Sequence, residues 1–136
     1  MNLPNAPKNI IIDYLKKKIS PSLIILFGSA AKGTMRPDSD IDIAFLSDKQ
    51  FTDYELFLIG QGLADVLQKE VDLVDLNKAS TVFQAQVVGN GIAIYCNDEK
   101  KRMYFEMIVL KKYARLNEER QRIIDNIKER GSIYGH

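Results

Sequence analysis

Residues 22–46 decide the fold, and they read SLIILFGSAAKGTMRPDSDIDIAFL. The stretch opens with a continuous apolar run up to Phe27, which is typical of a buried strand. From Asp40 onward, polar or small residues alternate with large apolar ones, and this period of two predicts a second strand. We therefore expect a strand–turn–helix–strand unit whose second strand has one polar face.

The turn at residues 28–33 offers groups that suit a phosphate. Gly28 and Gly33 have no Cβ atom, so the backbone there can approach a ligand closely and adopt a positive φ. Ser29 adds a hydroxyl donor, and residues 30–32 are expected to open a short helix whose first N–H groups are free to bind an anion. A Gly-Ser pair is also common in ordinary turns, so the turn alone does not establish a phosphate site.

Two carboxylates follow the turn, at Asp40 and Asp42, and the alternation puts both on one face of the second strand. Neighbouring carboxylates repel each other unless a cation neutralises them. The other interpretation has Asp40 capping a turn and Asp42 at a solvated edge, and the preceding Gly-Ser turn makes it the weaker one. The one histidine, His136, is the last residue, so a metal would be held by oxygen atoms, which favours Mg²⁺ or Mn²⁺.

The chain carries the pattern G-S-x-A-x-G followed by S-D-x-D, which resembles the minimal nucleotidyltransferase domain of the polymerase-β-like superfamily. The matching positions are Gly28, Ser29, Ala31, Gly33, Ser39, Asp40 and Asp42. The resemblance implies an α/β (α+β) fold, with a mixed sheet of about four strands and helices packed on one side of it. It also implies two metal-binding aspartates and usually a third carboxylate on a later strand.

Two candidates for that third carboxylate, Asp72 and Asp75, lie in the apolar run of residues 70–76. They are three apart, so on a strand they face opposite sides and cannot both line one site. The family's motif places the residue after the strand's first apolar residue in the site, which here is Asp72. Asp75 would then face away or lie in a turn at the strand's end. The alternative is that both are ordinary polar residues at strand ends.

The resemblance also implies a role for each residue of the motif. Asp40, Asp42 and Asp72 would be catalytic and would hold two magnesium ions, with manganese as the other option. Gly28, Ser29, Gly33 and Ser39 would bind the ATP substrate. Lys32 and Arg36 could neutralise phosphate charge, although cations in loops are commonly just solvated.

Composition excludes several other classes of protein. With 136 residues, 46% of them hydrophobic, the chain is expected to form a single domain with a real core. No apolar run approaches the roughly 20 residues of a membrane span, and no signal-peptide pattern opens the chain, so no membrane association is expected. The single cysteine, Cys96, cannot form an internal disulfide; this suggests a cytoplasmic protein in which Cys96 is a small core residue.

The formal net charge of +1 conceals an asymmetry along the chain. Residues 1–98 contain 9 Lys and Arg against 12 Asp and Glu, whereas residues 99–136 contain 10 against 6. An acidic catalytic part argues against a nucleic-acid groove, and the mixed charges of the C-terminal part are typical of a solvated helix face. We expect no direct binding of nucleic acid.

The other segments are expected to form the scaffold. They are an irregular lead-in over residues 2–7, a helix over 9–18 ended by Ser20-Pro21, a helix begun by the capping box of Thr52 and Glu55, a helix over 80–88, a turn over 89–91 and a strand over 92–96. The helix after Thr52 has a core-facing stripe of Leu56, Ile59, Leu63 and Leu67.

A nucleotidyltransferase core over residues 1–98 and a helical tail over residues 99–136 are expected to make up this single domain. Apolar residues recur at helical spacing along the tail, as one helix or as two with a break near Leu116. So small a sheet cannot cover all of them. The tail either packs on its own domain or offers part of its apolar stripe to a partner.

The tail, with Tyr113–Leu116 and the closing GSIYG of residues 131–135, is similar to one subgroup of the family. These are stand-alone nucleotidyltransferase antitoxins that are paired with a HEPN-domain ribonuclease toxin. The resemblance implies a magnesium-dependent protein adenylyltransferase that transfers AMP from ATP to a tyrosine of its toxin and silences it. Two alternatives stay open: a nucleotidyltransferase that acts on a small molecule, and a non-catalytic antitoxin that acts by binding alone.

Overall fold

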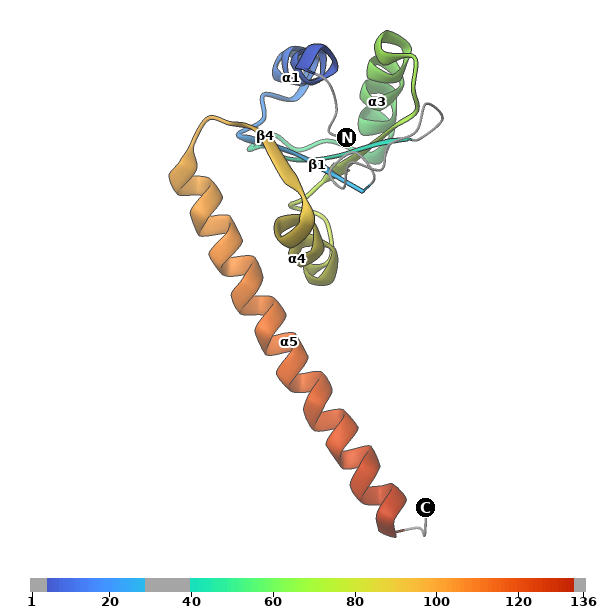
Figure 1. Ribbon diagram of the computed structural model, residues 1–136, viewed down its shortest axis with the longest axis vertical. Coiled ribbons are helices and arrows are strands. Elements are labelled where there is room, and N and C mark those ends of the chain that lie inside the picture. The colour runs from blue at the N-terminus through green and yellow to red at the C-terminus, as the bar shows by residue number, and fades with distance from the viewer. Residues whose placement is uncertain (1–4, 29–39, 134–136) are drawn as a thin grey trace.

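The computed structural model describes the backbone of residues 5–28 and 40–133 and the side chains of residues 6–28 and 40–126. The elements follow in the order α1 (Asn5–Ile19), β1 (Leu23–Phe27), β2 (Ile41–Leu46), α3 (Asp53–Leu67), β3 (Val71–Asp75), α4 (Thr81–Asn90), β4 (Ile92–Cys96) and α5 (Glu99–Ile133). Figure 1 shows a small sheet between helices, from which one long helix extends. Every strand predicted from the sequence is present, within one residue at each end.

The strands form one mixed sheet in the order β3-β2-β1-β4. Strand β1 is antiparallel to both of its neighbours, β2 and β4, whereas β2 and β3 run parallel. The register pairs Phe27 with Asp42 and pairs Asp42 with Asp72. The end of β1 therefore meets the starts of β2 and β3 at one end of the sheet.

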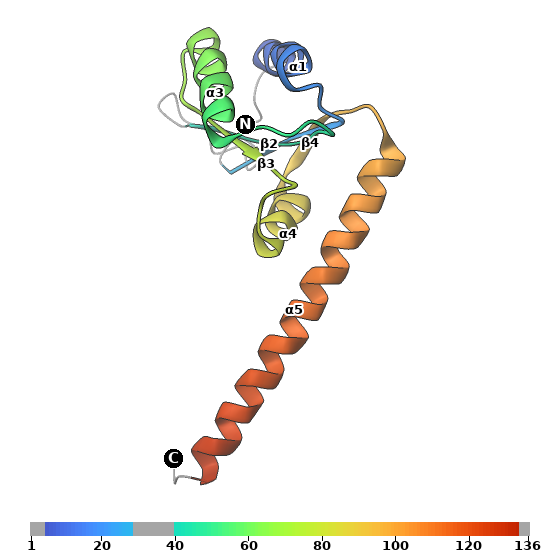
Figure 2. The same cartoon turned by 180° about the vertical axis from the view of Figure 1, so that it is seen from behind.

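Helices cover both faces of this sheet, so the covering on one side that the resemblance implied is wrong. Helices α1 and α3 lie on one face, and α4 lies on the other with the first turns of α5 (Figures 1 and 2). The reason is that the strands carry apolar side chains on both faces. Ile24 and Phe45 pack with α1 and α3, while Ile25 and Leu46 pack with α4.

The first helix begins earlier than the sequence predicts. Helix α1 starts at Asn5, so the predicted irregular lead-in is wrong for residues 5–7. Pro7 lies in the first turn, where its missing N–H has no intrahelical partner to lose. The helix ends as predicted, because Ser20 adopts a positive φ of 47° and Pro21 cannot continue the helix.

The capping box is confirmed, and the helix after the third strand is longer than predicted. Thr52 accepts the Glu55 N–H and the Glu55 carboxylate accepts the Thr52 N–H, which begins α3. Helix α4 continues through Gly89 and Asn90, so the predicted turn is wrong at those two residues. The helix ends where the Gly91 N–H bonds back to the last turn.

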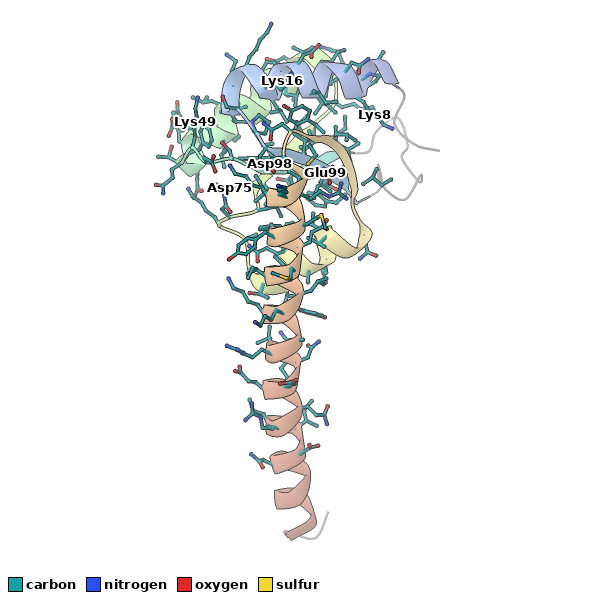
Figure 3. All side chains as sticks on the ribbon, turned by 90° about the vertical axis from the view of Figure 1, so that its left-hand side faces the viewer. Lys8, Lys16, Lys49, Asp75, Asp98 and Glu99 are labelled. Atoms are coloured by element: carbon teal, nitrogen blue, oxygen red, sulfur yellow. The ribbon has the colours of Figure 1, made fainter. Side chains whose placement is uncertain are left out.

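The C-terminal segment is a single helix, with no break near Leu116. Asp98 begins it by accepting the N–H groups of Lys100 and Lys101, and the Lys101 ammonium pairs with Asp48 at 2.9 Å. Figure 3 shows α5 starting at Asp98 and Glu99 beside the sheet, and beyond the turns that pack near α4 the helix extends away from the other elements. Large apolar side chains are exposed along it, at Met103, Tyr104, Met107, Leu110, Ile123 and Ile124. None of the described helices is long and apolar enough to cross a membrane.

Candidate functional site

Gly28 directly follows β1 and has a backbone conformation that favours glycine. Its φ is +66°, and a Cβ atom added there would lie 2.3 Å from Oδ2 of Asp42. The Asp42 carboxylate therefore lies against the Gly28 backbone with no room for a side chain between them. The sequence predicted a close approach at this glycine, and in the structure the group that approaches is one of the predicted catalytic carboxylates.

Asp42 and Asp72 are paired residues of adjacent parallel strands, so their side chains leave the same face of the sheet. Asp40 precedes β2 and is exposed. Burial raises the pKa of Asp42, and the negative charges of Asp72 and Asp40 raise it further. Asp42 thus lies close enough to the other two carboxylates to be repelled by both, in a partly buried place that disfavours its charge.

This donor set fits a hard divalent cation, because it consists of carboxylate oxygens whose charges repel each other. In the side-chain conformations described here, no three acidic, histidine or cysteine side chains are gathered closely enough to hold an ion. Magnesium is commonly held by one or two carboxylates together with substrate phosphates and water, so Asp42 and its neighbours could hold it once a triphosphate is bound. A bound cation would remove the repulsion that raises the pKa of Asp42.

Asp75 lies on the opposite face of β3. It pairs with Phe45, which is fully buried in the core beneath α1 and α3. Its own side chain is buried, and Oδ1 accepts the Asn77 N–H at 3.0 Å in the turn after the strand. Asp75 has a structural role in this turn, and it does not share a face with Asp42 and Asp72.

A cleft beside Asp42 was not predicted from the sequence. It has a volume of ≈ 480 Å³, within the range of about 300–1,000 Å³ that is usual for ligand sites. Its lining consists of Phe27, Gly28, Asp42, Phe83, Gln86, Val87 and Asn90. The rings of Phe27 and Phe83 meet edge to face with 5.4 Å between their centroids. Four of these lining residues, Phe83, Gln86, Val87 and Asn90, come from α4. Their spacing in the sequence is that of residues on one face of a helix, and this spacing could have indicated a shared surface.

The other predicted nucleotide-binding residues lie outside the described part of the chain. They are Ser29, Lys32, Gly33, Arg36 and Ser39. Of the predicted site, the structure therefore brings together Gly28, Asp40, Asp42 and Asp72.

Comparison with known proteins gives matches along most of the chain. The family described as "Polymerase beta, Nucleotidyltransferase" matches residues 9–100. The protein adenylyltransferase MntA of Shewanella oneidensis is 37% identical over 130 residues, which are 95% of this chain and 93% of MntA.

Two solved structures are similar over nearly the same extent. A chain in the crystal structure of a toxin–antitoxin with AMP-PNP has a TM-score of 0.79 and 38% identity, covering 89% of this chain and 98% of that one. A chain in the structure of a tri-AMPylated Shewanella oneidensis HEPN toxin with an MNT antitoxin has a TM-score of 0.76 and 35% identity, covering 90% and 97%.

Proposed function

Since this chain belongs to the polymerase β nucleotidyltransferase family, we propose that it transfers AMP from ATP to a tyrosine of a HEPN-domain ribonuclease toxin and so silences it. The observation that carries the proposal is the extent of the likeness to a protein adenylyltransferase, which runs along 95% of this chain. The solved neighbours add support, because one contains an ATP analogue and another an AMPylated HEPN toxin.

Each residue of the site has a role in this proposal. Asp40, Asp42 and Asp72 would hold magnesium, which when bound would neutralise the triphosphate and lower the pKa of the attacking hydroxyl. The turn of Gly28 and Ser29 would hold the terminal phosphates through backbone N–H groups and the serine hydroxyl. Gly33, Ser39, Lys32 and Arg36 would complete the nucleotide site.

The transfer exchanges one phosphorus–oxygen bond for another. The phenolic oxygen of the tyrosine bonds to the α-phosphorus, the bond from that phosphorus to the β-phosphate oxygen breaks, and pyrophosphate leaves with the electron pair. A phenol has a pKa of about 10, so its proton must be taken up as the attack proceeds. Asp72 is suited to accept it, because it is exposed on β3, an edge strand that an acceptor protein can reach.

The tail belongs to the same proposal. A core over residues 1–98 would carry the chemistry, and the tail over residues 99–136 would use the exposed apolar residues of α5 to hold the toxin. The protein would act in the cytoplasm, where ATP and the RNA targets of a ribonuclease are both present.

RNA cleavage by the toxin tests this function against silencing by binding alone. Toxin incubated with this chain, ATP and Mg²⁺ should stop cleaving RNA, whereas toxin incubated with this chain without ATP, or with EDTA present from the start, should keep cleaving it. The Asp40→Asn/Asp42→Asn variant, which keeps the shape of the site, should fail to silence the toxin at equal dose. Full silencing by that variant without ATP would show that the chain acts by covering the toxin.

A further inference from the structure

The outer face of α3 carries a cluster of large apolar side chains that the described part of the chain leaves uncovered. Tyr54, Phe57 and Leu58 are 69%, 59% and 49% exposed. Their spacing of three and four residues puts them on one face of the helix. Exposed clusters of this kind commonly mark a binding surface.

A groove beside this apolar cluster runs between α3 and the edge strand β3. It consists of two hollows of ≈ 310 and ≈ 520 Å³ that share Gln61 and Val71. Phe57 and Asp72 both line the smaller hollow. The α3–β3 groove therefore lies beside the apolar cluster and reaches the edge of the sheet at Asp72, whose carboxylate leaves the opposite face of the sheet from α3.

The length and the charge of the groove limit the kinds of ligand that it can bind. Its lining extends along α3 from Asp53 to Gln68, roughly 22 Å at the rise of an α-helix. About seven residues of extended chain have that length. The charged residues that line it are four acidic residues and one lysine, namely Asp53, Asp65, Glu70, Asp72 and Lys69. An occupant with apolar and basic side chains complements this surface.

Two other occupants fit the groove less well. A second copy of the chain in a two-fold dimer would place the groove against itself, so that carboxylates would oppose carboxylates. A small-molecule acceptor could reach Asp72 but would leave Tyr54, Phe57 and Leu58 exposed. A segment of another protein accounts for both the length and the apolar cluster.

We propose that the α3–β3 groove docks the segment of the acceptor protein that carries the modified tyrosine. The segment has apolar residues that cover Phe57 and its neighbours, and lysine or arginine residues near the tyrosine that meet the acidic lining. Docked there, the segment lies along the edge strand β3, and its tyrosine side chain reaches over that edge to the Asp72 carboxylate on the other face of the sheet. This inference rests on the proposed function for the identity of the acceptor, a HEPN-domain toxin.

Direct binding of the toxin to Phe57→Asn tests the groove without depending on catalysis. We expect calorimetry, in the absence of ATP, to give a Kd for the toxin that is about tenfold weaker or more than for the wild type. Val66→Asn is the matched control, because Val66 is 54% exposed on the same helix but does not line the groove. Its Kd should stay within about twofold of the wild type, as for a surface change outside an interface.

Steady-state transfer of AMP at saturating ATP provides the second measurement. Phe57→Asn should raise the KM for the toxin by the same factor as the Kd and leave the KM for ATP unchanged. Unaltered Kd and KM in Phe57→Asn, or an equal loss in Val66→Asn, would overturn the docking proposal. A wild-type chain that binds the toxin but transfers no AMP would refute the proposed function, and the Kd of Phe57→Asn would still decide the groove.

Discussion

Asp42→Asn should make the protein more stable in the absence of metal and nucleotide, although it removes a residue that the proposed reaction needs. Asp42 lies partly buried beside Asp72, and both the burial and the negative charges of Asp72 and Asp40 raise its pKa. At a pH above its raised pKa the Asp42 carboxylate is charged in the folded and the unfolded chain, but only the folded chain brings it close to other carboxylates. An amide of the same shape removes that repulsion.

The size of the gain follows from the spacing of the strands. Asp42 and Asp72 are paired on neighbouring strands, whose backbones lie about 4.8 Å apart. Two unit charges about 5 Å apart repel by roughly 0.8 kcal/mol in water and by roughly 3 kcal/mol at an effective dielectric constant of about 20. Asp72 is exposed and well screened, so we expect a gain of about 1 kcal/mol. For a chain of this length that gain raises Tm by roughly 4 °C.

Thermal melting in EDTA measures this gain, and melting with Mg²⁺ provides the counterpart. Magnesium should raise the Tm of the wild type, because a ligand that binds only the folded state stabilises it, and should raise that of Asp42→Asn much less. The advantage of Asp42→Asn should disappear as the pH falls through the raised pKa of Asp42, because the folded wild type then takes up a proton before the unfolded chain does.

Asp75→Asn is the matched control for this prediction. Asp75 lies on the same strand as Asp72 but faces the other side of the sheet, and asparagine keeps the oxygen that accepts the Asn77 N–H. It should therefore gain no stability. A Tm for Asp42→Asn at or below that of the wild type in EDTA, or an equal gain in Asp75→Asn, would refute the repulsion argument.

Two further predictions concern Gly28 and the start of α3. Gly28→Ala should lower the free energy of unfolding by about 1–2 kcal/mol in urea denaturation, because its φ is positive, and it should also impair AMP transfer because the new Cβ displaces the Asp42 carboxylate. Glu55→Ala should melt below the wild type at pH 7, and the gap should close on acidification. Hydrogen bonds from the Thr52 backbone and side chain lower the pKa of Glu55, so its stabilising effect is lost as the pH falls through that lowered pKa.

The carboxylates could be placed from the sequence because a strand has a period of two. The alternation after Asp40 fixed the face of Asp42, and the separation of three residues put Asp72 and Asp75 on opposite faces. The choice between Asp72 and Asp75 required the family's motif, since the period alone cannot say which face is the site. The core that packs around Phe45 accounts for the orientation of Asp75, and it appears only when the helices are in place.

The parts that escaped prediction depend on contacts between distant segments. Pro7, Gly89 and Asn90 usually interrupt helices, but here they lie in the first or last turn, where a helix tolerates them. The apolar stripe of α3 predicts only which face is buried, and it does not predict the exposed Tyr54 and Phe57 on the other face. Phe57 lines one hollow with Asp72 because α3 packs beside β3, and no local pattern encodes that packing.

The central claim is tested most directly by the intact mass of the HEPN-domain toxin. The toxin is incubated with ATP, Mg²⁺ and one form of this chain before its mass is measured. The forms to compare are the wild type, Asp72→Asn and Asp75→Asn, each shown by melting to be folded. We predict that the wild type and Asp75→Asn add whole adenylate units to a tyrosine, and that Asp72→Asn leaves the mass unchanged. No mass change with the wild type, or adenylation that survives Asp72→Asn and is lost in Asp75→Asn, would contradict the account.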